Sequence, residues 1–332
     1  MNTTAAIIIT AVIAAVLGVL FTGRLIPKLK EKQMGQNIRE EGPEAHKAKA
    51  GTPSMGGIAI IGAVTVAMIT GCVLTRLSVF HGTPAVIADA GIILAGFILF
   101  GLIGFLDDYL KVIKKENEGL KVKPKFGAQF IIATALALYM VYATPNGSQV
   151  YIPIYGQTVD FGFWYVPFII FTMLAMVNAV NLTDGLDGLA SSVTVIVALT
   201  LCSMGMAFSA QASTLFNVAL AGGCLGFLVF NKNPAKVFMG DTGSLALGGG
   251  ITVAAIVMKM ELFLPLIGII YVLEVLSVCI QVSYFKLTHG KRIFRMTPLH
   301  HHFELGGMKE TRVVLLFSCI TLIACITGLL LI

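Results

Sequence analysis

Apolar residues form long runs along this chain, and polar residues are confined to the stretches between them. One run, Ala85 to Leu106, has about the twenty residues that an α-helix needs to cross a bilayer. Runs of this kind cover approximately residues 5–26, 55–75, 86–106, 127–143, 163–180, 189–209, 213–230, 244–260, 262–285 and 313–332. The pattern predicts an all-α polytopic membrane protein with about ten transmembrane helices.

Two stretches depart from this simple pattern. The ninth run contains Pro265, Glu274 and Gln281, so we expect a bent or broken helix there. Residues 150–161 alternate around Gly156, which predicts a small β-hairpin. No linker or repeat divides the chain, so we expect residues 1–332 to form a single integral membrane domain.

Composition strengthens the membrane assignment. The chain is 57% hydrophobic and 12% charged, with a mean hydropathy of +0.89, whereas soluble domains carry about 25% charged residues. The first run lacks a preceding basic region and a cleavage signature, so it predicts a transmembrane helix and not a signal peptide. The six cysteines lie inside apolar runs without CxxC spacing, which suggests neither a disulfide framework nor a zinc site.

Basic residues predict the orientation. All but two of the 23 lysines and arginines lie with the loops after the first, third, seventh and ninth runs; the exceptions are Arg76 and Lys259. Cytoplasmic loops carry such an excess. We therefore expect these loops to face the cytoplasm, and both termini and the hairpin to face outward.

Two adjacent carboxylates, Asp107 and Asp108, end the third run. Acidic groups at a membrane boundary are costly and repel each other, and a divalent cation with its preference for oxygen ligands would offset this. A solvated helix end is the simpler explanation for this pair alone. Consecutive helical residues point about 100° apart, so only one of the two would face a site fully.

Other polar segments on the same side carry related groups. Residues 47–57 place Lys47 and Thr52 before a glycine pair that opens the second run, which suits a phosphate or a simple helix cap. Residues 178–188 carry acids and amides with no basic residue, more than Asx turns would explain. The candidates in that acidic segment are Asn181, Asp184 and Asp187.

The last two segments add an acid, an aromatic ring and histidines. Residues 231–244 contain Asn231, Phe238, which could stack on a base or anchor the loop, and Asp241 in a Gly-Asp-Thr-Gly-Ser turn. Residues 297–304 contain His300, His301 and His302. In an extended segment His300 and His302 would share a face, which suits zinc, a diphosphate or proton transfer.

Together these segments describe one kind of chemistry. Aspartates that suit Mg²⁺, with lysine and histidine for phosphates, indicate a phosphoryl-transfer site facing the cytoplasm. Its place at the membrane edge favours a lipid phosphate as one substrate. An enzyme of this kind is expected to have no nucleic-acid partner.

Four motifs resemble those of a known family. They are Phe105-Leu106-Asp107-Asp108-Tyr109, Asn181-Leu182-Thr183-Asp184-Gly185-Leu186-Asp187-Gly188, Val237-Phe238-Met239-Gly240-Asp241-Thr242-Gly243-Ser244 and Pro298-Leu299-His300-His301-His302-Phe303-Glu304. The chain resembles the phospho-N-acetylmuramoyl-pentapeptide transferase (MraY) family of the polyprenyl-phosphate N-acetylhexosamine-1-phosphate transferase superfamily. The acidic motifs are shared across the superfamily, and the histidine motif is similar to that of the peptidoglycan branch.

The resemblance implies a reaction, a cofactor and partners. UDP-N-acetylmuramoyl-pentapeptide and undecaprenyl phosphate would give lipid I and UMP with Mg²⁺, at the cytoplasmic face of the bacterial inner membrane, in peptidoglycan synthesis. Members of the family are homodimers with a split ninth helix.

The resemblance also implies roles for the candidate residues. Asp241 would bind magnesium, His300 would lie near the diphosphate, and Asp107 would act as base or nucleophile beside Asp108. The nucleotide-side cleft would be lined by Asn181, Asp184 and Asp187, with Phe238 on uracil, and by Lys47, Thr52, Asn231, His301 and His302 as further substrate contacts.

Alternatives remain open at this point. The lipid phosphate could attack directly after Asp107 removes a proton, or an aspartate could first form a phosphoryl-enzyme. Direct attack is favoured because a phosphate monoester near neutral pH needs little activation. The same chemistry on UDP-N-acetylglucosamine is the nearest rival function. A secondary transporter is a rival of another class, although such proteins place their sites near the midplane and carry internal repeats, which this chain lacks.

Overall fold

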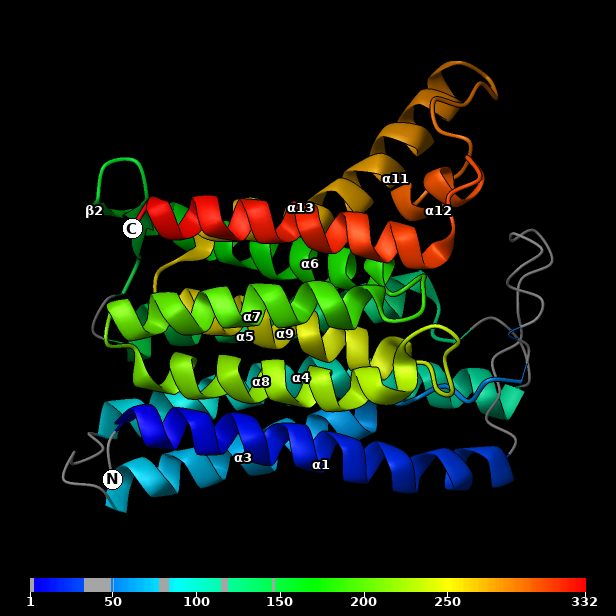
Figure 1. Cartoon of the computed structure of the whole chain (residues 1–332). Coiled ribbons are helices and arrows are strands. Elements are labelled where there is room, and N and C mark those ends of the chain that lie inside the picture. Colours follow the sequence, from blue (N-terminus) through cyan, green and yellow to red (C-terminus); the bar gives the residue numbers. More distant parts are fainter. Residues whose placement is uncertain (1–2, 33–48, 50, 78–83, 115–118, 145–146) are drawn as a thin grey trace.

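Ten long helices form the protein in a computed structural model, which describes residues 3–32, 49, 51–77, 84–114, 119–144 and 147–332 (Figure 1). All ten are long and apolar enough to span a membrane, so the predicted number and the all-α class are confirmed. They are α1 (Thr3–Glu31), α3 (Gly57–Leu77), α4 (Pro84–Lys114), α5 (Val122–Ala143), α6 (Tyr165–Thr183), α7 (Leu189–Ala207), α8 (Gln211–Asn231), α9 (Gly240–Val257), α11 (Ile269–Leu287) and α13 (Glu310–Leu330).

The predicted hairpin is also present. Strands β1 (Gln149–Ile152) and β2 (Gln157–Asp160) pair antiparallel, with Val150 opposite Val159. A single 3-10 turn, η1 (Gly162–Trp164), leads from the hairpin into α6. Val150 is fully buried while every residue of β2 is exposed, so one strand holds the hairpin against the helices.

The ninth span is broken, as its sequence predicted. A 3-10 turn, η2 (Glu261–Phe263), and a four-residue helix, α10 (Leu264–Ile267), end at Gly268, and α11 starts at the next residue. Proline stands in the first turn of α10, where its missing N–H is tolerated. Beyond the break α11 runs away from the other helices at an angle, and α12 (Leu299–Glu304) returns beside it (Figure 1).

Helix α9 lies at the centre of the bundle. Of its most apolar window, 83% is buried, the largest share among the ten spans. It packs against α4 and α6, and close approach requires glycine: a Cβ at Gly104 of α4 would overlap the backbone of Asp241, and one at Gly57 of α3 would overlap Gly243. Glycine therefore brings the starts of α3 and α9 and the end of α4 together at one point.

The two ends of the bundle differ. The start of α1, the end of α13 and the hairpin lie at one end, and α12 lies at the other (Figure 1). The termini thus share a side, as an even number of spans requires. That this side faces outward stays a prediction from the basic loops.

Candidate active site

Three carboxylates meet where α4 ends and α9 begins. Asp107 and Asp108 are 2% and 5% exposed, and Asp241 comes from the first turn of α9. One carboxylate oxygen of each lies within 4.8 Å of the other two. The structure therefore joins two motifs that are 133 residues apart in the chain, because α4 and α9 pack closely at Gly104.

Asp108 binds the start of α9. Its carboxylate accepts the backbone N–H groups of Asp241 (3.1 Å) and Thr242 (2.9 Å) and the Thr242 hydroxyl (2.6 Å). The first N–H groups of a helix have no partner within the helix, and a carboxylate there also interacts favourably with the helix dipole. Asp108 thus stabilises α9 from a neighbouring helix and places the Asp241 backbone.

Asp107 and Asp241 instead share two lysines. Lys111 Nζ lies 2.5 Å from Asp107 Oδ2 and 3.1 Å from Asp241 Oδ2. Lys125 Nζ lies 2.5 Å from Asp241 Oδ2, and Asn181 donates its amide to Asp241 Oδ1 at 2.9 Å. Sequence analysis missed both lysines; Lys111 stands one helical turn after Asp107, and that spacing was the available signal.

The acidic segment after α6 divides into two parts. Burial, and then the charges of Asp241, Asp108 and Asp187, raise the pKa of Asp184 well above its usual range. Asp184 thus belongs electrostatically to the three-carboxylate site. Asp187, by contrast, is 4% exposed and is held by a separate group of residues.

That group, which we call the loop clasp, consists of Lys49, Asp187, Asn233 and Glu310. Lys49 Nζ lies 2.7 Å from one oxygen of Asp187 and 2.7 Å from one of Glu310. Asn233 donates its amide to both carboxylates, at 3.0 and 2.8 Å, and the Asp187 N–H donates to Glu310 at 2.6 Å. The clasp ties the segments before α3, α7, α9 and α13 together, and sequence analysis did not select Lys49, Asn233 or Glu310.

The three histidines lie on a helix, α12, and not on the extended segment considered from the sequence. His300 is 1% exposed and its Nδ1 lies 3.0 Å from Glu274 of α11. His301 Nδ1 lies 2.9 Å from Glu304, and His302 Nδ1 accepts the backbone N–H of Arg295 at 3.1 Å. A proline-initiated helical turn therefore gives each ring its own partner.

The other candidates have mixed surroundings. Asn231 is 2% exposed, donates to the carbonyl of Val237 at 3.0 Å and accepts from Ser191. Phe238 and Thr52 are half-buried, and the Phe238 N–H donates to the carbonyl of Pro53 at 2.8 Å. Lys47 lies outside the described residues.

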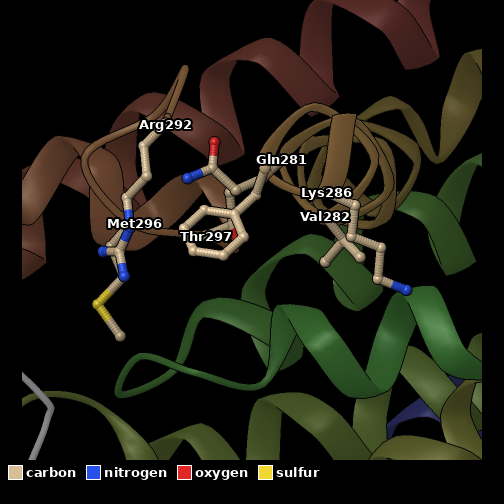
Figure 2. Close-up of a pocket in the computed structure, with 7 residues that line it drawn as sticks. Gln281, Val282, Lys286, Arg292, Met296 and Thr297 are labelled. Carbon is tan, nitrogen blue, oxygen red and sulfur yellow. The ribbon is translucent and has the colours of Figure 1, made fainter. Parts of the chain in front are cut away.

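A cavity of about 550 Å³ lies beside α11 (Figure 2). Its lining is Gln281, Val282, Phe285, Lys286, Arg292, Met296 and Thr297. Gln281, one of these lining residues, accepts the backbone N–H groups of Ile293 and Phe294, both at 3.0 Å. None of the three carboxylates contributes to this lining, so the cavity is a feature of the α11 region.

The carboxylate site suits a hard divalent cation. Mg²⁺ prefers oxygen ligands and often binds through one or two carboxylates together with substrate phosphates. Asp107 and Asp241 fit this role, since their present partners are mainly the cations Lys111 and Lys125. Asp108 fits it less well because α9 already uses both of its oxygens.

Comparison with known proteins agrees with this geometry. Residues 90–259, which carry all three carboxylates, match the family described as Glycosyl transferase family 4. The chain is therefore a transferase built from membrane-spanning helices.

More specific matches narrow the class. Residues 49–61 match Phospho-N-acetylmuramoyl-pentapeptide-transferase signature 1. Proteins named phospho-N-acetylmuramoyl-pentapeptide-transferase from Heliobacterium modesticaldum and Clostridium perfringens are each 47% identical to this chain over 96% of its length. The matched regions cover 96% and 95% of those two proteins, respectively. One from Clostridium novyi is 45% identical over 97% of this chain and 96% of its own length. The chain belongs to the phospho-N-acetylmuramoyl-pentapeptide-transferase family, which confirms the resemblance found in its motifs.

Proposed function

We propose that this protein transfers phospho-N-acetylmuramoyl-pentapeptide from UDP-N-acetylmuramoyl-pentapeptide to undecaprenyl phosphate, giving lipid I and UMP for peptidoglycan synthesis. The observation that carries the proposal is the group of three carboxylates and two lysines between α4, α5 and α9. Cations and metal-ligating acids at one place are what a transfer between two phosphate-bearing substrates needs. The family supports the choice of substrates.

Magnesium is the proposed cofactor, with Asp241 as its ligand, which leaves Asp107 to act on the lipid phosphate. Mg²⁺ bound there would neutralise charge on the diphosphate and on the leaving UMP. Lys111 and Lys125 would remain close enough to contact the same phosphate oxygens, because both already lie against these carboxylates.

We propose direct transfer without a covalent enzyme intermediate. A phosphate oxygen of undecaprenyl phosphate attacks the sugar-bearing phosphorus, the new P–O bond forms and the bond to UMP breaks. Asp107 accepts the last proton of the lipid phosphate. Asp108 acts through the position of α9, since its oxygens are bound by the start of that helix.

The nucleotide and sugar are proposed to lie on the side of the acidic segment. Asn181 and Asp184 line this side next to Asp241, with Phe238 on the uracil ring and His300 at the diphosphate. Lys47, Thr52, Asn231, His301 and His302 remain candidates for further substrate contacts, and Asp187 acts through the loop clasp that fixes the segment.

The setting of the enzyme follows from the same reasoning. We propose one domain over residues 1–332, a place in the bacterial inner membrane with the site facing the cytoplasm, and a homodimer. Basic residues that the structure describes support the orientation, because Lys111 and Lys125 contact the carboxylates and Lys49 contacts the acidic segment.

The test of function is a transferase assay in detergent with radiolabelled UDP-N-acetylmuramoyl-pentapeptide and undecaprenyl phosphate. We expect Asp107→Asn, Asp241→Asn and His300→Ala each to lower kcat by at least about 100-fold. Asp160→Asn, the same change on the exposed hairpin strand, is the matched control and should keep full activity. Near-normal turnover in all three variants would reject the site, and a preference for UDP-N-acetylglucosamine would reject the substrate.

The direct mechanism has its own test. With the nucleotide substrate alone, we expect no stoichiometric release of UMP, because no acceptor is present. A burst of one UMP per enzyme before lipid is added would instead require a phosphoryl-enzyme.

A further inference from the structure

Glu274 is a buried carboxylate to which the proposed reaction gives no role. It lies on α11, just beyond the break in the ninth span, and its side chain is 0% exposed. Burying a carboxylate without a partner is strongly unfavourable. Its partner is His300: Oε1 lies 3.0 Å from His300 Nδ1, and both oxygens accept the His300 backbone N–H, at 3.3 and 3.4 Å.

This contact determines where the imidazole proton lies. An ionised carboxylate can only accept hydrogen bonds, and Glu274 also accepts the His300 backbone N–H, so a carboxylate here places the ring hydrogen on Nδ1. In a histidine held this way, the partner of one ring nitrogen decides the state of the other. Nε2 is thereby left without a hydrogen, as a hydrogen-bond acceptor.

The other side of the ring shows where Nε2 points. Nε2 is buried and has no hydrogen-bond partner among the described residues. It faces Gly185, where a Cβ would overlap it, and Gly185 directly follows Asp184. His300 therefore reaches from α12 to the acidic segment beside the carboxylate site, into space that only glycine leaves open.

We propose that Glu274 is a positioning residue for the transfer reaction: it holds the proton of His300 on Nδ1 and orients Nε2 toward Gly185 and the acidic segment, where the diphosphate is proposed to bind. This rests on the proposed function. Because Glu274 belongs to α11, which diverges from the bundle, the placement of that helix sets the placement of the ring. In metal sites, a carboxylate that orients a histidine is worth about 10- to 100-fold in activity, and we expect a similar effect here.

The first test reads the proton directly. The protein labelled with ¹⁵N-histidine, in detergent, is compared with His300→Ala to assign the His300 signals. We expect Nδ1 to be protonated in the native enzyme and to lose this state in Glu274→Gln, whose amide can donate to Nδ1. A native spectrum with unprotonated Nδ1, or no change in the variant, would overturn the proposal. Neither result depends on turnover, so a failure of this proposal can be distinguished from a failure of the proposed transferase function.

The second test is kinetic. We expect Glu274→Gln to lower kcat roughly 10- to 100-fold, with KM for both substrates within about twofold. In the His300→Ala background the same change should cost nothing further, because Glu274 acts only through the ring. Losses that multiply in the double variant, or a loss confined to KM, would show a merely structural role and overturn the proposal.

Matched variants separate these outcomes from misfolding. Glu261→Gln alters another carboxylate, 1% exposed and near the hairpin, and should keep kcat. Gly185→Ala leaves Glu274 intact but fills the space facing Nε2, so we expect a comparable fall in kcat with Nδ1 still protonated. Full activity in Gly185→Ala would overturn the direction proposed for Nε2.

Discussion

Asp107 and Asp108 are neighbours with different surroundings. The side chain of Asp108 points to the start of α9 and takes three hydrogen bonds there. Asp107 accepts the N–H of Leu120 at 2.9 Å and faces the two lysines. The 100° between consecutive helical side chains therefore turns Asp108 toward α9 and Asp107 toward the lysines, where we propose that it takes part in the reaction.

The different surroundings of the two aspartates predict different effects of replacing each with asparagine. Asp108→Asn should lower the free energy of unfolding by about 1–3 kcal/mol, because an amide group turned toward the N–H donors of α9 leaves buried groups unpaired. Asp107→Asn should leave thermal stability nearly unchanged while abolishing turnover. Thermal unfolding in detergent, followed beside the transferase assay, checks both; equal loss of stability in the two variants would contradict the assignment.

At the scale of elements, the hairpin is fastened to the break in the ninth span. Lys259, whose φ is 60°, donates its ammonium to the carbonyl of Gly147 (2.7 Å) and to the Tyr165 hydroxyl (2.9 Å), and Tyr165 lies 3.4 Å from Glu261. The backbone of Tyr151 also donates to the Lys259 carbonyl at 3.1 Å. Burial raises the pKa of Glu261 to about 8 and lowers that of Lys259.

These pKa shifts predict how stability depends on pH. The carboxyl of Glu261 has a pKa of 4.5 when exposed and about 8 in the folded protein. Between these values the folded state holds a proton that the unfolded state releases, so the stability contributed by Glu261 is lost as pH rises through this window. Glu261→Gln should flatten the fall in melting temperature from pH 5 to pH 8, which we expect to be roughly 3–5 °C. An unchanged slope would contradict this prediction.

At the scale of the whole molecule, ten spans place the start of α1 and the end of α13 at the hairpin end (Figure 1). Among the described residues, lysines contact both the carboxylate site, through Lys111 and Lys125, and Asp187 of the loop clasp, through Lys49. If positive charge sets the orientation, the site faces the cytoplasm and the termini face outward.

A reporter fusion tests this orientation. Alkaline phosphatase, which is active only outside the cytoplasm, should be active when fused after Ile332 and inactive when fused after Gly290, in the exposed loop between α11 and α12. The opposite pattern would place the site outside the cytoplasm, where a cytoplasmic nucleotide substrate could not reach it.

The ten spans, the break in the ninth span, the hairpin and the candidate aspartates of the site were all predictable from the sequence. Hydrophobic runs, proline and alternation act locally, so they can be read from neighbouring residues. The family motifs likewise lie within short segments, and the match over residues 90–259 covers the three acidic ones.

Which side chains contact one another became known only from the folded structure. Asp108 meets Thr242 across 134 residues, Asp187 meets Glu310 across 123, and His300 meets Glu274 across 26. Those contacts depend on how helices pack, and the first of them depends on the close approach that glycine permits between α4 and α9. No local pattern encodes a packing distance, so Lys111, Lys125 and the loop clasp became evident only in the folded chain.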